Sequence, residues 1–170
     1  MMHSYTVKSA LSVALFGFLA MGLAPVASAA TNTTTTFTVT AGVGNTCIIS
    51  ATNMAFTTIP TTTASNATSS ISVGCTLNDP YTVGLSAGDS GVETARYMEG
   101  KNASNKLYYA LSSSSSMSPN WGITNGAQSG TGAGTSSPTV FQVYGQITAA
   151  QAAAAAVDNY TDTITVTVTY

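Results

Sequence analysis

Polar and apolar residues alternate with a period of two in several separate stretches of the chain, and each stretch predicts a β-strand. The first runs from Thr31 to Val43, with threonines on one side and mostly apolar residues on the other. No earlier strand precedes it to form a hairpin. Its partner must therefore be a distant strand of the same chain or a strand of another molecule.

Further alternating or apolar runs follow at the spacing typical of a β-sandwich. They lie at residues 48–56 (interrupted by Asn53), 68–75, 81–86, 96–98, 107–111, 140–144 and 163–170. The serine run 112–116 and the stretch 126–137 are predicted to be low-complexity loops. The alanine run 152–156 lacks a convincing cap and is predicted to be a loop with at most one helical turn. About seven strands without a true helix predict an all-β sandwich.

Residues 1–29 have the pattern of a cleaved signal peptide. Lys8 lies in the first part, an apolar run follows at residues 11–19, and Ala27-Ser28-Ala29 forms an A-x-A cleavage site. A transmembrane helix is the alternative, but the apolar run is short for a bilayer and ends in small residues. We therefore expect cleavage after Ala29 and export of the remaining chain.

Charge excludes one class of partner. After removal of the leader, the only cations would be Arg96, Lys101 and Lys106, set against more numerous carboxylates. So few cations cannot neutralise a run of phosphates, and nucleic-acid binding is not expected.

The two cysteines, Cys47 and Cys75, would enter an oxidising compartment. One disulfide between them is the simple expectation, and closing this loop would stabilise the fold by about 3 to 4 kcal/mol. Metal ligation is the alternative, but the chain's single histidine, His3, lies in the leader and no CxxC motif is present. Neither a metal nor a cofactor is expected.

Gly88-Asp89-Ser90-Gly91 is similar to the nucleophile sequence of chymotrypsin-type proteases. A nucleophilic serine needs a base, and no histidine would remain after the leader is removed. Lys101 and Lys106 lie in a polar, turn-rich stretch that would not depress a lysine pKa. We interpret the motif as a loop between strands.

Two other sets of residues could in principle carry chemistry. Glu93 and Glu99 could act as the paired carboxylates of a glycosidase, but nothing in their spacing marks them. Trp121, together with tyrosines at 97, 108 and 109, could stack on a sugar, although a lone tryptophan beside apolar residues is more often part of a core. Neither pattern predicts catalysis.

Both ends of the exported chain carry a long, threonine-rich strand without a lysine or proline to protect its edge. The two ends therefore pair either within one molecule or between molecules.

Several motifs occur together in a familiar order along nearly the whole exported chain, and with them the sequence resembles the spore coat protein U family, which includes subunits of archaic chaperone-usher pili. The motifs are Phe37-Thr-Val-Thr, Cys47-Ile-Ile-Ser, Ile71-Ser-Val-Gly-Cys75, Tyr81-Thr-Val-Gly-Leu-Ser-Ala-Gly88, Arg96-Tyr-Met98, Leu107-Tyr-Tyr-Ala-Leu111, Trp121-Gly122, Val143-Tyr-Gly-Gln-Ile147 and Tyr160-Thr-Asp-Thr-Ile-Thr-Val-Thr-Val-Thr-Tyr170.

The resemblance implies an incomplete immunoglobulin-like β-sandwich that is completed by donor-strand complementation. Residues 30–44 would form the donor-strand extension and residues 45–170 the sandwich domain. The donor side chains would be Thr35, Phe37, Val39, Ala41 and Val43, and the acceptor groove would be lined by the last strand through Ile164, Val166, Val168 and Tyr170.

The implied function is that of a non-catalytic structural subunit of a surface pilus that supports adhesion and biofilm formation. The implied partners are neighbouring pilus subunits, a periplasmic chaperone and an outer-membrane usher, with export through the periplasm to the cell surface. Two alternatives stay open. A monomeric, secreted carbohydrate-binding or adhesive module would fold the first strand into its own groove, and a hydrolase would depend on Ser90 or Glu93.

Overall fold

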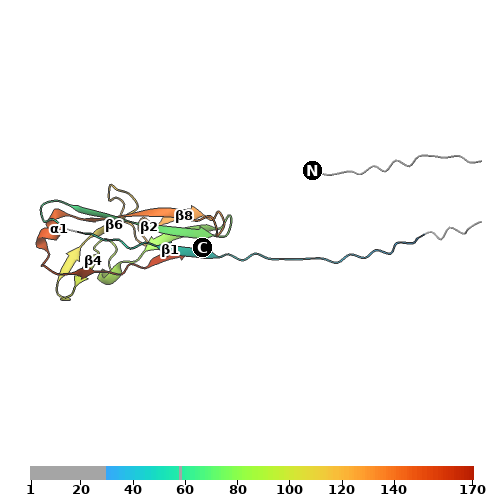
Figure 1. Ribbon diagram of the computed structural model, residues 1–170, viewed down its shortest axis with the longest axis horizontal. Coiled ribbons are helices and arrows are strands. Elements are labelled where there is room, and N and C mark those ends of the chain that lie inside the picture. Colours follow the sequence, from blue (N-terminus) through green and yellow to red (C-terminus); the bar gives the residue numbers. More distant parts are fainter. Residues whose placement is uncertain (1–29, 58) are drawn as a thin grey trace, which may run out of the picture. The chain divides into compact units, whose positions relative to one another are not determined.

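The computed structural model describes residues 30–57 and 59–170, so the predicted signal peptide lies outside the described residues. Within this part the fold is almost entirely β-structure, as predicted (Figure 1). The strands are β1 (Cys47–Ala51), β2 (Ser65–Cys75), β3 (Pro80–Leu85), β4 (Tyr97–Gly100), β5 (Lys106–Tyr108), β6 (Ala110–Ser112), β7 (Gln128–Thr131), β8 (Thr139–Ile147), β9 (Tyr160–Thr161) and β10 (Val166–Thr169). One 3-10 turn, η1 (Gly88–Ser90), and one helix, α1 (Ala149–Ala154), complete the elements.

All strand pairs are antiparallel, in three sheets. The four-stranded sheet has the order β1-β2-β8-β6, and the two three-stranded sheets have the orders β10-β3-β7 and β5-β4-β9. The register pairs Ile71 of β2 with Phe141 of β8, and Val168 of β10 with Val83 of β3. Alternation in the sequence therefore sets which side chains of each strand face inward.

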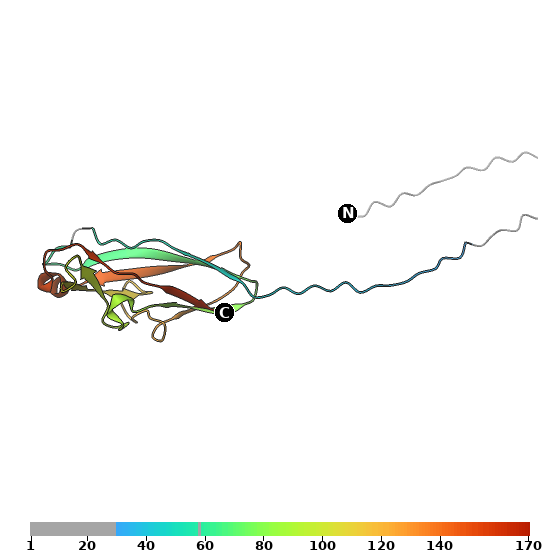
Figure 2. The same ribbon diagram turned by 90° about the horizontal axis from the view of Figure 1, so that it is seen from below.

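The core lies between the β1-β2-β8-β6 sheet and the β10-β3-β7 sheet, which form two facing layers (Figure 2). Buried side chains come from β2 (Ile71, Val73) and from β3 (Val83, Leu85). Trp121 is 0% exposed, and its indole N–H donates to the carbonyl oxygen of Val83 at 3.0 Å. The indole is satisfied inside the core, so Trp121 is a core residue, as its apolar surroundings predicted.

The predicted disulfide is confirmed: Cys47 and Cys75 are bonded, with an S–S distance of 2.03 Å. The two residues are register partners at the first position of β1 and the last position of β2. The bond therefore joins the edge strand β1 to its neighbour at the end where the chain enters the fold.

Helix α1 begins three residues earlier than the predicted turn at 152–156 and ends at Ala154. Its cap was overlooked in the sequence. The Thr148 hydroxyl accepts from the Gln151 N–H at 3.2 Å, and the Gln151 side chain accepts from the Thr148 N–H at 2.8 Å, which is a capping box. Among the helices of the described residues, none is long and apolar enough to span a membrane.

Three other sequence predictions differ from the structure. The run 107–111 forms two strands separated at Tyr109, whose N–H donates to the carbonyl oxygen of Arg96 at 3.1 Å. The predicted loop 126–137 contains β7, which is short and rich in glycine and serine but pairs with β3. The strand predicted from Thr31 to Val43 is absent: residues 30–46 form neither helix nor strand, because their side chains are exposed and no strand of the described residues pairs with them.

Candidate functional site: a groove between two strand edges

Edge strands of the sheets in the described part of the chain form the two sides of the candidate site. β1, β9 and β10 are each the last strand of a sheet. β9 and β10 belong to one extended stretch, 160–169, because Thr165 between them exchanges hydrogen bonds with Ser86: the Ser86 N–H donates to the Thr165 carbonyl oxygen, and the Thr165 N–H donates to the Ser86 hydroxyl, both at 2.9 Å. This stretch is thus bonded along one edge, and no strand of the described residues pairs with the other.

The opposite edge begins where β1 ends. At Thr52 only one backbone bond of the ladder remains, from the Thr52 N–H to the Ser70 carbonyl oxygen at 3.0 Å. The Ser70 N–H donates instead to the Thr52 hydroxyl at 2.9 Å, and the Thr52 carbonyl oxygen accepts from the Ser69 hydroxyl at 2.5 Å. Such local side-chain bonds compete with strand pairing. Residues 53–56 then run on without pairing to any strand of the described part.

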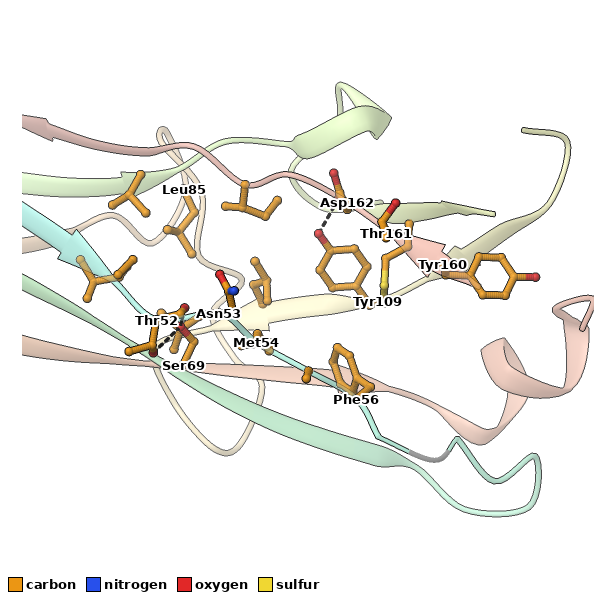
Figure 3. A pocket seen from close by; sticks show the side chains of 18 residues that line it. Thr52, Asn53, Met54, Phe56, Ser69, Leu85, Tyr109, Tyr160, Thr161 and Asp162 are labelled. Carbon is orange, nitrogen blue, oxygen red and sulfur yellow. Dashed lines mark hydrogen bonds between the residues drawn. The ribbon is translucent and has the colours of Figure 1, made fainter. Parts of the chain in front are cut away.

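A groove of about 530 Å³ lies between these two edges (Figure 3). One wall is formed by residues 51–56 and the other by residues 160–166. The floor is apolar, and its side chains come from β2, β3, β6 and β8: Ile71, Leu85, Leu111 and Val143. The groove therefore opens directly onto the core of the sandwich.

The first wall rests on the sheet through Met54 and Phe56, both half-buried against the core. They lie over Gly145 of β8, where an added Cβ would overlap the Met54 sulfur and come within 3.0 Å of the Phe56 ring. A glycine at this position leaves space for the side chains of Met54 and Phe56.

The second wall carries a carboxylate, that of Asp162, which is held by hydrogen bonds. The Tyr109 hydroxyl donates to Oδ2 of Asp162 at 2.5 Å, and Oδ1 of Asp162 accepts from the Asp89 N–H at 3.0 Å (Figure 3). Burial is the main cause that raises the pKa of Tyr109, and the hydrogen bond and charge of Asp162 add to it. Tyr109 thus stays a neutral donor that fixes Asp162 and the start of residues 162–165.

Behind the groove floor, the guanidinium of Arg96 is 1% exposed. It donates to the carbonyl oxygens of Leu85 (3.0 Å), Ser86 (2.7 and 2.9 Å), Glu93 (2.9 Å) and Trp121 (2.9 Å). Burial lowers its pKa from the ordinary value. Arg96 therefore ties the end of β3 to the loops that precede β4 and β7. Sequence reasoning treated it only as one of few cations and missed this role.

The predicted acceptor residues fall into two groups. Ile164 and Val166 line the groove. Val168 packs against the core outside the lining, and Tyr170 is half-exposed at the end of the chain. The wall formed by residues 51–56 was not predicted, because its position depends on tertiary packing rather than on periodicity.

The predicted donor residues lie in the segment without secondary structure. Phe37 and Val43 are each 87% exposed and Val39 is 80% exposed, and Thr35 and Ala41 are exposed as well. The apolar side chains of this segment are therefore not buried by the segment itself.

The residues considered for catalysis are engaged in local structure. The Ser90 hydroxyl donates to the carbonyl oxygens of Ala87 (2.8 Å) and Val92 (3.0 Å) within η1. The Glu93 carboxylate accepts from the Ile123 N–H at 2.7 Å, which lowers its pKa. Glu99 lies on β4 opposite Lys106. The Ser90 hydroxyl and the Glu93 carboxylate thus hold turns in place.

The sequence model of the Spore Coat Protein U domain matches residues 33–167. A search of curated proteins found no match. Among solved structures, one similar chain belongs to the CsuC–CsuE chaperone–tip adhesion subunit pre-assembly complex from the archaic chaperone-usher Csu pili of Acinetobacter baumannii (24% identity, TM-score 0.49, covering 75% of this chain and 40% of that one).

Another similar chain comes from a chaperone–tip adhesin complex in the biogenesis of CFA/I fimbriae (19% identity, TM-score 0.38, covering 69% of this chain and 37% of that one). This chain therefore spans less than half the length of either of these two chains. The family match extends over the disulfide, both walls of the groove and most of the predicted donor segment. On that match, the chain belongs to the Spore Coat Protein U domain family.

Proposed function

We propose that this protein is a structural subunit of a chaperone-usher surface pilus, and that its groove receives residues 30–44 of a neighbouring copy. The observation that carries the proposal is the groove between two strand edges, open to the apolar core along the wall 160–166. A strand inserted there would find backbone partners on either side and apolar side chains beneath. It would complete an immunoglobulin-like sandwich.

The donor segment suits the groove in pattern and in length. In an extended conformation, alternate side chains from Thr35 to Val43 point to one side, and Phe37 and Val39 stand among them. These residues would span about 26 Å and the groove wall 160–166 about 20 Å, so the segment is long enough to run along the whole groove. The threonines on the other side would face solvent, as the outer side of a strand in a sandwich requires.

The energetics favour a long-lived joint. Burial of Phe37, Val39 and Val43 would contribute about 1.5 to 3 kcal/mol each, and each ladder hydrogen bond about 0.5 to 1.5 kcal/mol. Because the inserted strand completes the core, leaving the groove would mean partial unfolding. Dissociation would therefore be slow.

The same groove explains the partners in the proposal. Before assembly its floor is an exposed apolar surface, which is a liability for aggregation. A periplasmic chaperone would cover it, and an outer-membrane usher would organise the exchange of the chaperone for the next subunit. Export after cleavage at Ala29, surface display, adhesion and biofilm formation belong to this proposal, and no catalysis does.

Deletion of residues 31–43 and the substitution Phe37→Asp test the proposal. Both should abolish polymers while leaving a chaperone-bound subunit, because an aspartate cannot be buried in an apolar groove without a partner. Thr38→Asp is the matched control, since it places the same charge on the solvent side of the donor strand. The readouts are ladders on detergent gels without boiling and electron microscopy of the cells.

Normal fibres from the deletion variant or from Phe37→Asp would refute the proposal. Protein that stays monomeric without a chaperone, and resists heating in detergent as a monomer, would refute it in favour of a self-complemented adhesive module.

A further inference from the structure

Residues 44–46, which connect the predicted donor segment to β1, are bonded to the turn that follows β2. The Thr76 N–H donates to the carbonyl oxygen of Thr46 at 2.9 Å, and the Thr46 N–H donates to the Thr76 hydroxyl at 2.9 Å. These bonds continue the pairing of β1 and β2 by one position beyond Cys47 and Cys75. The chain thus enters β1 in an extended conformation.

A second contact lies one residue earlier. The Asn45 side-chain N–H donates to Oδ1 of Asp79 at 3.1 Å. Asp79 is 8% exposed and its backbone is itself bonded, with its N–H donating to the Thr76 carbonyl oxygen at 3.1 Å and its carbonyl oxygen accepting from the Gly132 N–H at 2.8 Å. In the described part of the chain, no donor reaches its Oδ2. Asp79 is therefore a fixed anchor whose carboxylate receives its side-chain hydrogen bond from Asn45.

These contacts bear on where the donor segment can go. The groove begins at Ala51, and residues 44–46 lie at the opposite end of β1. To enter the groove of its own chain, the donor segment would have to reverse direction in a short loop immediately before Cys47. Gly44-Asn45 is a sequence that favours such a turn. The turn would break the bonds of Asn45 and Thr46 to Asp79 and Thr76.

Because the donor segment is tethered to its own groove through β1, its insertion into that groove is favoured unless a contact opposes the turn. A segment joined to β1 by a three-residue loop would face its own groove at a millimolar effective concentration. The groove of another copy is presented at whatever lower concentration the protein has in solution. Without an opposing contact, insertion into the groove of the same chain would therefore be favoured over insertion into another copy.

We propose that Asn45, Thr46, Thr76 and Asp79 form a root clamp that holds the start of the donor segment extended and keeps it out of the groove of its own chain. The inference rests on the proposed function, because it assumes that the segment fills a groove. The four are positioning residues, since they lie outside the groove lining. Each hydrogen bond of the clamp should shift the ratio of intrachain to interchain insertion by about two- to tenfold.

The test replaces Phe37 by the photoreactive p-benzoylphenylalanine in the full chain and irradiates the exported, purified protein. Mixing ¹⁵N-labelled and unlabelled copies separates crosslinks within a chain from crosslinks between chains by peptide mass. Asn45→Ala removes the exposed partner of Asp79, and Asn45→Ala combined with Thr76→Val removes the side-chain bonds of the clamp. Asn66→Ala is the matched control, because it removes a 2.9 Å amide hydrogen bond to Gln146 on the outer face of the sheet.

Relative to the unchanged chain, the intrachain share of crosslinks to the groove should rise about two- to tenfold in Asn45→Ala and further in the double variant. Asn66→Ala should leave it unchanged. Asn45 is exposed, so the single variant should fold, and thermal unfolding compared with that of Asn66→Ala verifies this. An unchanged ratio in both clamp variants, or intrachain crosslinks that already dominate in the unchanged chain, would overturn the clamp.

A different result would overturn the proposed function itself. If residue 37 reaches no groove residue of any copy, the donor segment does not fill the groove, and the clamp falls with it. Crosslinks that reach the groove between chains, with a ratio insensitive to Asn45 and Thr76, would overturn the clamp alone.

Discussion

Tyr109, the residue that separates β5 from β6, holds Asp162 of the groove wall 160–166 by a 2.5 Å hydrogen bond between its hydroxyl and Oδ2 of the carboxylate. The bond joins two segments that are far apart in the sequence. It also places a buried phenol next to a carboxylate, which makes the stability of the fold sensitive to alkaline pH.

Tyr109→Phe should test this sensitivity. The pKa of Tyr109 is raised in the folded state, whereas a tyrosine in the unfolded chain ionises near pH 10. Above that pH the folded state binds more protons than the unfolded state, so the free energy of unfolding falls as the pH rises. The variant should lose about 1 to 2 kcal/mol at neutral pH and show a smaller decline above pH 10. Urea unfolding at several pH values measures both, and equal slopes for the two proteins would contradict the prediction.

Arg96→Lys should be strongly destabilising despite the conserved charge. A lysine cannot satisfy the carbonyl oxygens of Leu85, Ser86 and Trp121 at once, and it would bury an ammonium group. We expect a loss of about 3 kcal/mol or more in the free energy of unfolding. Lys101→Met, which removes an exposed cation, is the control and should change stability by less than about 0.5 kcal/mol. A comparable effect of both changes would argue against the role given to Arg96.

Gly145→Ala should disturb the wall formed by residues 51–56, because the added methyl group overlaps Met54. Overpacking of this kind typically costs about 1 to 3 kcal/mol. Met54→Ala removes the obstacle, so the double variant should be more stable than the sum of the two single effects predicts. Denaturant unfolding of the four proteins gives the coupling energy. Simple additivity would show that Gly145 and Met54 do not constrain each other.

Replacement of Cys47 and Cys75 by alanine should lower the free energy of unfolding by about 3 to 4 kcal/mol, since the loop between them is long and its closure constrains the unfolded chain. Reduction of the unchanged protein by dithiothreitol should give a similar loss. Unfolding midpoints in urea, with and without reductant, measure the effect. If the alanine variant matched the oxidised protein, the disulfide would have no part in stability.

Sequence periodicity was sufficient for the strands whose inner faces are apolar. Ile71 and Val73 alternate with serines and glycine in β2, and Val166 and Val168 alternate with threonines in β10. In both, the period of two matches the burial that the structure has. The short β7 escaped prediction because its Gln-Ser-Gly-Thr sequence has no apolar pattern and is held only by pairing with β3.

The groove was only half predictable for a related reason. Ile164 and Val166 follow the alternation of residues 163–170 and were expected in the groove lining, although only Val166 lies within β10. Met54 and Phe56 lie in an irregular segment, whose position is set by Thr52 and by the room over Gly145. Tertiary contacts of this kind leave no periodic signal. The buried position of Arg96 was not predicted either, because cations are usually exposed.

The disulfide at the first position of β1 also decides how the fold responds to force. An edge strand pulled from its free end normally peels away from its neighbour one hydrogen bond after another. Here tension applied at residues 44–46 passes through the bond between Cys47 and Cys75 into β2, which is paired on both sides. β1 therefore cannot be unzipped from β2 from that end.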